Sequence, residues 1–217
     1  MITTPVLSRL AVITPEPEAP SEDGCPRDDI CPMAAFADLQ MTSWYHDGVH
    51  WALENSVMNG VGSGRFEPDT PTSRAMIVTM LHRIEGEPTS DLAITFEDVP
   101  EDQWYTEAIR WAVAERIVNG YSDEVFGPNN DLTREQLAAI LCRYAQYKGM
   151  DTGAGEAAPL TGFADVAQVS DWAVPSVCWA VDAGIINGVD RDKLSPGTDA
   201  SRAQVATMLM RFLQMDQ

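Results

Sequence analysis

The chain has 217 residues, 45% of them hydrophobic, and a formal net charge of −19 at pH 7. This length and apolar fraction suit a globular protein with a real core, and they exclude a chain that is disordered throughout. The acidic balance argues against a nucleic-acid partner, which needs clustered lysine and arginine, and no apolar run approaches the about 20 residues of a membrane span, so we expect no membrane insertion.

Residues 1–32 are predicted to form a proline-rich N-terminal arm or linker. The first residues lack the apolar stretch of a secretion signal, so no signal peptide is expected in this chain. Cys25 and Cys31 end the arm at a spacing that allows a small local disulfide. Because two ligands alone make a poor zinc site, we predict a disulfide between them, which would suit an oxidising compartment.

From residue 33 onward the chain contains three copies of one unit, which we place at 33–92, 93–159 and 160–217. Recurrence at fixed intervals is typical of repeat architectures. The landmarks that recur at the same two intervals are Trp44, Trp104 and Trp172; Trp51, Trp111 and Trp179; Gly60, Gly120 and Gly188; Pro68, Pro128 and Pro196; Arg74, Arg134 and Arg202; and Arg83, Arg143 and Arg211.

Each copy is predicted to contain two helices. In the second copy, Trp104, Ala108, Trp111 and Ala112 share one helical face, which predicts the first helix. This helix is expected to stop at Asn119-Gly120, with the glycine as a left-handed C-terminal cap. The equivalent glycines in the other copies are Gly60 and Gly188.

The second helix of each copy has apolar residues at i, i+3, i+4 and i+7, beginning with Leu137 in the second copy. Ser73, Thr133 and Ser201 are the predicted N-caps. Capping boxes are expected in the second and third copies and not in the first, where Met76 stands in place of glutamine. Because one hairpin of this size cannot bury its apolar face, we predict an all-α assembly of three packed hairpins with approximate threefold symmetry.

An arginine follows each cap, in the helical turn where a positive charge is mildly unfavourable. One explanation is an anionic ligand, held by the guanidinium together with the helix N-terminus. The other is an internal carboxylate, from the recurring Phe-x-Asp segments that contain Asp38, Asp98 and Asp165. The residues alone leave both explanations open.

Several of these landmarks together resemble the bacterial S-layer homology (SLH) domain. The resemblance rests on the Phe-x-Asp opening, the tryptophan, the Gly-Ile-Ile-Asn-Gly turn at 184–188, the Phe-x-Pro loop and the Ser/Thr-Arg start of the second helix. It covers all three copies. The resemblance implies a pseudo-threefold, three-pronged spindle that anchors a protein non-covalently to secondary cell-wall polysaccharide, and hence an extracellular, wall-associated location.

The resemblance also implies a ligand, a sugar carrying a pyruvate ketal, bound in the grooves between neighbouring repeats. Its carboxylate would meet the motif arginine, the turn glycines would let the sugar approach the backbone, and the later tryptophan of each copy is a candidate aromatic platform. The implied ligand-binding residues are Arg74, Arg134, Arg202, Gly60, Gly120, Gly188, Trp51, Trp111 and Trp179. Leu194 in place of the loop phenylalanine, and Met76, indicate that the three grooves differ.

Other functions are less well supported by the residues. His46 and His50 have the i, i+4 spacing of helical metal ligands, but they occur in one copy only and are interpreted as surface helix residues, so no metal or other cofactor is expected. No catalytic constellation recurs, and no acidic loop fits an EF-hand, so we predict a non-enzymatic protein. A repeat scaffold that binds a protein partner at the cell surface, or after release, is the alternative.

Overall fold

The computed structural model describes residues 25, 27–153, 160–189 and 192–215. Within this part of the chain the structure has six α-helices and no β-strand, which confirms the all-α prediction. None of the described helices is long and apolar enough to cross a membrane. Residues 1–24 of the predicted arm lie outside the described residues.

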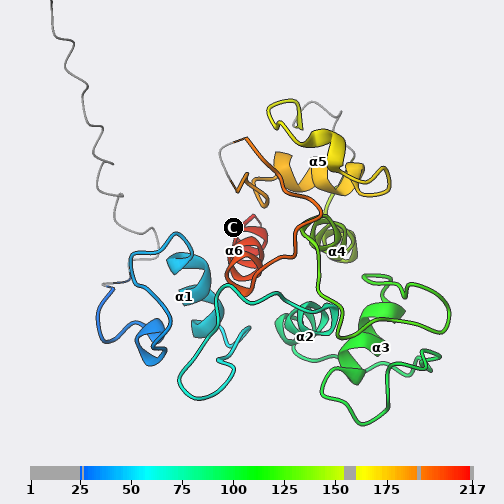
Figure 1. The fold of residues 1–217 in the computed structure, drawn as a ribbon. Helices are drawn as coiled ribbons and strands as arrows, with labels where there is room; N and C mark the ends of the chain where they lie inside the picture. Colours follow the sequence, from blue (N-terminus) through cyan, green and yellow to red (C-terminus); the bar gives the residue numbers. More distant parts are fainter. Residues whose placement is uncertain (1–24, 26, 154–159, 190–191, 216–217) are drawn as a thin grey trace, which may run out of the picture.

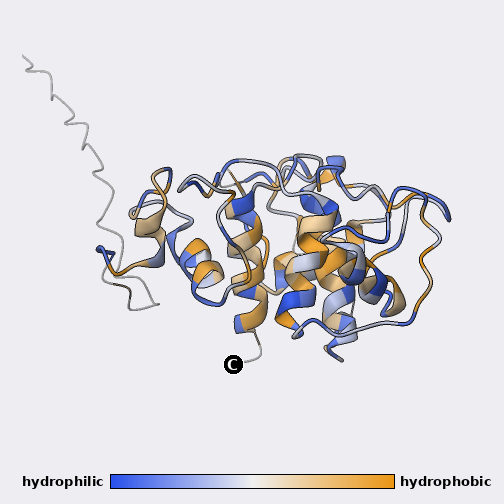
Figure 2. Ribbon diagram, turned by 90° about the horizontal axis from the view of Figure 1, so that it is seen from below, coloured by the Kyte–Doolittle hydropathy of each residue, from blue (hydrophilic) through white to orange (hydrophobic). Residues whose placement is uncertain are grey.

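Each repeat contributes one shorter and one longer helix. Figure 1 shows the longer helices grouped around the centre and the shorter ones outside them. Edge-on, in Figure 2, the repeats form one broad, shallow layer. The shorter helices are α1 (His46–Glu54), α3 (Thr106–Ala114) and α5 (Val174–Asp182), the longer ones are α2 (Arg74–Ile84), α4 (Arg134–Tyr147) and α6 (Arg202–Gln214), and two 3-10 turns are η1 (Pro32–Ala35) and η3 (Val166–Gln168).

The longer helices begin as predicted. The side chains of Ser73, Thr133 and Ser201 each accept a hydrogen bond from the third helical N–H. Capping boxes are present in α4 and α6, with no such box in α2. The predicted apolar faces of these helices form the core of the molecule.

The shorter helices differ from the prediction at both ends. Helix α3 starts at Thr106, so Trp104 precedes it and is 59% exposed. The left-handed residue after this helix is Arg116, with φ of 60°, so the predicted cap at Gly120 is wrong. A Cβ on Gly120 would instead lie 2.5 Å from the Phe96 ring and 2.7 Å from the Val125 carbonyl oxygen. This glycine is needed for close packing of its turn.

The helices pair across repeats. Helix α3 packs against α2 of the preceding repeat, α5 packs against α4, and α1 packs against α6 of the last repeat (Figure 1). The expected hairpins are thus not the main packing units, because each shorter helix buries its apolar face against the longer helix of a neighbour.

Three buried backbone positions close the assembly into a ring. The N–H of Thr72 donates to the carbonyl of Ala200 at 2.9 Å, that of Ala200 to Leu132 at 2.7 Å, and that of Leu132 back to Thr72 at 2.9 Å. All three residues have an exposed fraction of 0%. The first and third repeats are therefore joined as directly as the repeats that follow one another in sequence. The pseudo-threefold spindle itself stays a prediction.

Candidate functional site: three arginine grooves

The Phe-x-Asp aspartate of each repeat holds the loop that leads to its longer helix. In the second repeat, Asp98 accepts hydrogen bonds from the backbone N–H of Phe126 at 2.8 Å and of Gly127 at 2.7 Å. The same pairs of bonds join Asp38 to Phe66 and Glu67, and Asp165 to Leu194 and Ser195. Each carboxylate is therefore committed to its own loop.

The motif arginine holds the same loop from the other side. Nε of Arg74 donates to the carbonyl of Phe126 at 3.0 Å, and Nη2 donates to that of Asn119 at 2.7 Å. The direct pair between arginine and aspartate was one of the two explanations left open, and it is replaced by a single peptide unit, whose carbonyl bonds the arginine and whose N–H bonds the aspartate. The equivalent bonds run from Arg134 to Leu194 and Asn187, and from Arg202 to Phe66 and Asn59.

The helix N-terminus does not offer its N–H groups to a ligand, contrary to the anion-site hypothesis. The backbone N–H of Arg74 donates to Asn130, and that of Ala75 donates to Pro128. The third helical N–H, of Met76, donates to the Ser73 side chain. The equivalent donors of α4 and α6 are bonded in the same way. The N-termini of the three longer helices are therefore not available to an anion in these grooves.

The three motif guanidiniums are buried cations, since Arg74, Arg134 and Arg202 have exposed fractions of 7%, 4% and 5%. Desolvation by this burial lowers the pKa of all three. They remain charged at neutral pH, because the ordinary pKa of an arginine side chain lies far above 7. Arg74 lies over the Tyr121 ring at 4.5 Å, and Arg202 lies over the Phe66 ring at 4.5 Å. Such stacking favours the charged form.

A groove opens at each motif arginine, and we name each groove after it. The Arg74 groove has a volume of about 390 Å³ and combines all three repeats. Arg74 comes from the first repeat, the Gly120 turn with Gln136 and Arg143 from the second, and Trp172 from the third. The lining of this groove is thus shared by three repeats and not by two.

The other two grooves repeat this plan at different sizes. The Arg134 groove has about 350 Å³ and the Arg202 groove about 130 Å³. In the smaller one, Met76 takes the place of the glutamine of the other two. The lining residues equivalent to those of the Arg74 groove are Arg134, Gly188, Gln204, Arg211 and Trp44 in the second groove, and Arg202, Asn59, Met76, Arg83 and Trp104 in the third.

Each groove contains a second arginine, which comes from the last turns of a different longer helix from the one that carries the motif arginine. Desolvation by burial is the main cause that lowers the pKa of Arg74, and the positive charge of Arg143 lowers it further. Arg211 acts on Arg134 in the same way. Two like charges that repel each other across a groove are both stabilised when an anion binds between them. The recurrence of these arginines was visible in the sequence, but their approach to the motif arginines was not.

Comparison with protein families matches residues 35–75, 95–138 and 162–206 to the S-layer homology domain. The chain belongs to the SLH domain family. One relative is the Surface-layer 125 kDa protein of Lysinibacillus sphaericus, 30% identical over 85% of this chain and 16% of its own length. Another is an amylopullulanase of Thermoanaerobacterium thermosulfurigenes, 29% identical over 82% of this chain and 9% of its own length. A cellulosome-anchoring protein of Acetivibrio thermocellus is 22% identical over 72% of this chain and 35% of its own length.

The tryptophans of the SLH repeats divide into two classes. Of the predicted platforms, Trp111 and Trp179 have exposed fractions of only 2% and 6%. Trp51 is half-buried and also packs against the core. The tryptophans in the grooves are the earlier ones, with exposed fractions of 55% to 61%: Trp44, Trp104 and Trp172. We therefore move the proposed aromatic platform to these residues.

Two further expectations concern the start of the first SLH repeat. Cys25 and Cys31 are not joined by the predicted disulfide. They lie instead beside His46 and His50 of α1. Nor is His46 a surface residue, because its exposed fraction is 1%.

Proposed function

We propose that this SLH triplet is a non-covalent cell-wall anchor that binds secondary cell-wall polysaccharide through a pyruvylated sugar. The observation that carries the proposal is the meeting of two arginines and an exposed tryptophan in one groove. A carboxylate would accept charge-assisted hydrogen bonds from the guanidiniums, while the indole would cover an apolar face of the sugar. With a net charge of −19, the chain offers an acidic polymer little long-range attraction, so affinity depends on these local contacts.

The names of the relatives support a role in attachment. They include a surface-layer protein, a cellulosome-anchoring protein and an amylopullulanase. Because this chain spans only 9% of the amylopullulanase, the segment they share is a small part of that enzyme. Because an enzyme and a surface-layer protein have this segment in common, the segment is better explained by a location that they share than by a reaction that they share. We therefore assign the chain a non-enzymatic role at the extracellular face of the cell wall.

The grooves are proposed to contribute unequally. The Arg74 and Arg134 grooves, at about 390 and 350 Å³, have the volume usual for small-molecule sites. The Arg202 groove, at about 130 Å³, is too small to enclose a substituted sugar. Two of the three SLH grooves would then account for binding.

The test measures binding of the purified chain to wall polysaccharide from its own organism, before and after mild acid removal of ketal pyruvate. Arg143→Gln and Trp172→Ala are better probes than Arg74→Ala, because Arg74 also holds the loop at Phe126. Arg143→Gln is expected to weaken binding about 10- to 100-fold where the Arg74 groove dominates. Arg83→Gln, at the equivalent position of the small groove, is the matched control and should change little.

Removal of pyruvate should abolish the difference between the parent chain and Arg143→Gln. Equal binding by the parent, Arg143→Gln and Arg211→Gln would refute the groove assignment. Absence of binding to the intact polymer would favour the protein-binding scaffold instead.

A further inference from the structure

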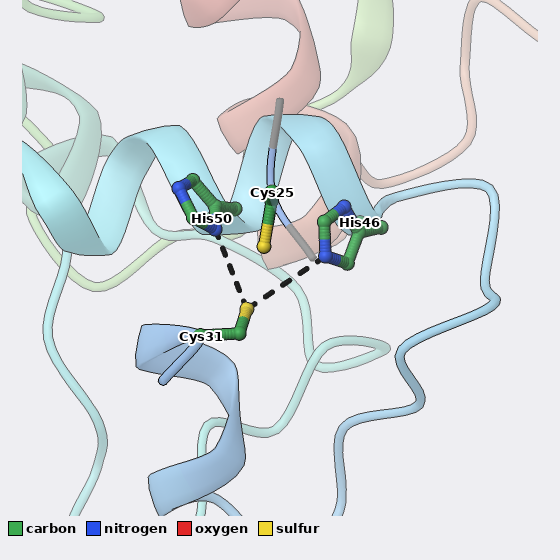
Figure 3. A group of neighbouring side chains, drawn as sticks. All are labelled: Cys25, Cys31, His46 and His50. Carbon is green, nitrogen blue, oxygen red and sulfur yellow. Dashed lines mark hydrogen bonds between the residues drawn. The ribbon is translucent and has the colours of Figure 1, made fainter. Parts of the chain in front are cut away.

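Four side chains that can ligate a metal converge at the start of the first repeat. Cys25, Cys31, His46 and His50 each offer one ligand atom, and these four atoms lie within 4.8 Å of one another (Figure 3). They come from the segment just before η1 and from the first two turns of α1. Cys31 and His46 are buried, with exposed fractions of 3% and 1%.

The distances in this cluster suit tetrahedral coordination. His46 and His50 lie one helical turn apart on the same face of α1. The Cys31 sulfur is 3.7 Å from Nε2 of His46 and 3.3 Å from Nδ1 of His50. In a tetrahedral zinc site, a sulfur and a nitrogen ligand lie about 3.6 Å apart, as follows from the usual Zn–S and Zn–N bond lengths. The two observed distances lie on either side of this value.

The second nitrogen of each imidazole faces a carboxylate. Nδ1 of His46 is 2.8 Å from Oδ1 of Asp47, and Nε2 of His50 is 3.5 Å from Oε2 of Glu54. Metal-bound histidines characteristically donate their other N–H to such a group, which orients the ring and strengthens it as a ligand. The Cys25 sulfur accepts a hydrogen bond from the backbone N–H of Arg27 at 3.4 Å. The cluster therefore has outer partners as well as ligands.

We propose that Cys25, Cys31, His46 and His50 bind one Zn²⁺ as a closed structural site. Two sulfur and two nitrogen ligands in a tetrahedron are the set typical of structural zinc. Zn²⁺ replaces the two thiol protons, which are released to solvent, so the ion and two thiolates have no net charge and can be buried. With four protein ligands, no coordination position is open to a substrate.

The sequence spacing agrees with this assignment in part. Fourteen residues separate Cys31 from His46, and three separate His46 from His50, both within the ranges of common zinc motifs. Five residues separate the two cysteines, more than the usual two to four. From the sequence, the two cysteines and the two histidines were interpreted as separate pairs, and for this reason no metal was expected.

The zinc site would fasten the segment around Cys25 to α1. In the second repeat, the helical positions of His46 and His50 are occupied by Thr106 and Arg110. There the Thr106 hydroxyl donates to the Pro100 carbonyl at 2.7 Å, and Arg110 pairs with Glu101 at 2.8 Å. The same helical face is thus attached to the preceding segment by hydrogen bonds and an ion pair. The metal would perform this task in the first repeat alone.

The test uses the full chain, produced without a histidine tag and purified under reducing conditions. Elemental analysis after exchange with zinc should give about one Zn²⁺ per chain for the parent. Cys31→Ser and His50→Gln should reduce this content at least tenfold. Cys178→Ala, which removes a buried cysteine of α5 that is not part of the cluster, should retain one Zn²⁺. Circular dichroism of each variant verifies that the helices are intact.

Cobalt(II) gives a readout of the ligand set. The parent is expected to show the visible bands of tetrahedral cobalt together with thiolate charge transfer, and Cys25→Ser should lose part of the charge-transfer intensity. A chelator should lower the melting temperature of the parent but not that of Cys31→Ser. Three results would each overturn the proposal: equal zinc in the parent and Cys31→Ser, no metal on the reduced parent in excess zinc, or a metal-free Cys25–Cys31 disulfide in chain isolated from the cell surface. None of these measurements depends on polysaccharide binding.

Discussion

At the scale of single residues, the SLH loops are organised around one residue that is held from two repeats. Arg134 of the preceding repeat holds the carbonyl of Leu194. Asp165, in the same repeat as Leu194, holds the N–H of Leu194 and also that of Ser195, which lies in the same peptide unit as this carbonyl. The two opposite charges are separated by a peptide unit that both of them polarise. Each charge therefore stabilises the other through the loop, without the direct ion pair that the sequence made equally plausible.

This arrangement makes the stability depend on pH through Asp165. Desolvation alone would raise the pKa of this carboxyl, but the N–H groups of Leu194 and Ser195 outweigh it, so that the pKa lies below the ordinary 3.8. A lowered pKa stabilises the fold above the ordinary value, and the contribution is lost as the pH falls through the folded-state pKa. Asp165→Asn should cost about 1.5 to 3 kcal/mol at pH 7, and much less at an acidic pH below the folded-state pKa.

Urea unfolding of the parent and Asp165→Asn at both pH values measures this difference. Asp182→Asn, at an exposed position of the same repeat, is the control and should leave the unfolding free energy nearly unchanged. If Asp165→Asn lowered the free energy of unfolding equally at both pH values, the loop would not require the ionised carboxylate.

The sequence singled out the motif arginines correctly as residues in need of a partner, because a cation at a helix start opposes the dipole. It could not name the partner. The acceptors on Arg74 are the carbonyls of Phe126 and Asn119, and every residue carries a carbonyl, so such contacts leave no trace in composition or spacing. The second arginine of each groove was visible as a recurring residue, yet only the fold places it opposite the first.

At the scale of elements, helical periodicity was a good guide inside helices and a poor one at their ends. Trp104 fits the helical pattern of Ala108 and Trp111, but α3 begins two residues later, where the Thr106 hydroxyl bonds the Pro100 carbonyl. The tryptophan is thereby left on the surface for the groove. The family resemblance had suggested Trp111 as a platform, but its helical position turns it into the core.

The turn after α3 gives a second prediction. Gly120→Ala should destabilise the protein by about 1 to 3 kcal/mol, because the new Cβ would meet the ring of Phe96 and the carbonyls of Ser122 and Val125. Thermal or urea unfolding measures the change. Gly162→Ala is a matched control, since no atom lies within 4 Å of a Cβ there. If Gly120→Ala were as stable as Gly162→Ala but failed to bind polysaccharide, the glycine would serve the ligand and not the packing.

At the scale of the whole molecule, the three SLH repeats pack into one assembly. Internal repeats in the sequence predicted the number and order of these units, and the apolar helix faces predicted the core. The sequence did not show which helix packs on which, because one apolar stripe is compatible with several partners. The structure pairs α1 with α6, from opposite ends of the chain, and closes the backbone ring through Thr72, Leu132 and Ala200.

The pairing predicts that removal of the last repeat also disrupts the first. A chain that ends at residue 159 lacks α6, against which α1 packs, and Arg202, which holds the carbonyls of Phe66 and Asn59. It should show less helix per residue by circular dichroism than the full chain, and no cooperative thermal transition, whereas the full chain should melt in a single one.

The decisive experiment adds residues 160–217, as a separate chain, to the truncated chain. If the missing ring contacts are what the truncated chain lacks, mixing the two fragments should restore both helix content and a cooperative transition, in a manner that depends on their concentration. A truncated chain that melts cooperatively by itself would mean that α2, α3 and α4 form a sufficient core. The α1–α6 contact would then be an addition to a stable pair of repeats and not a condition for folding them.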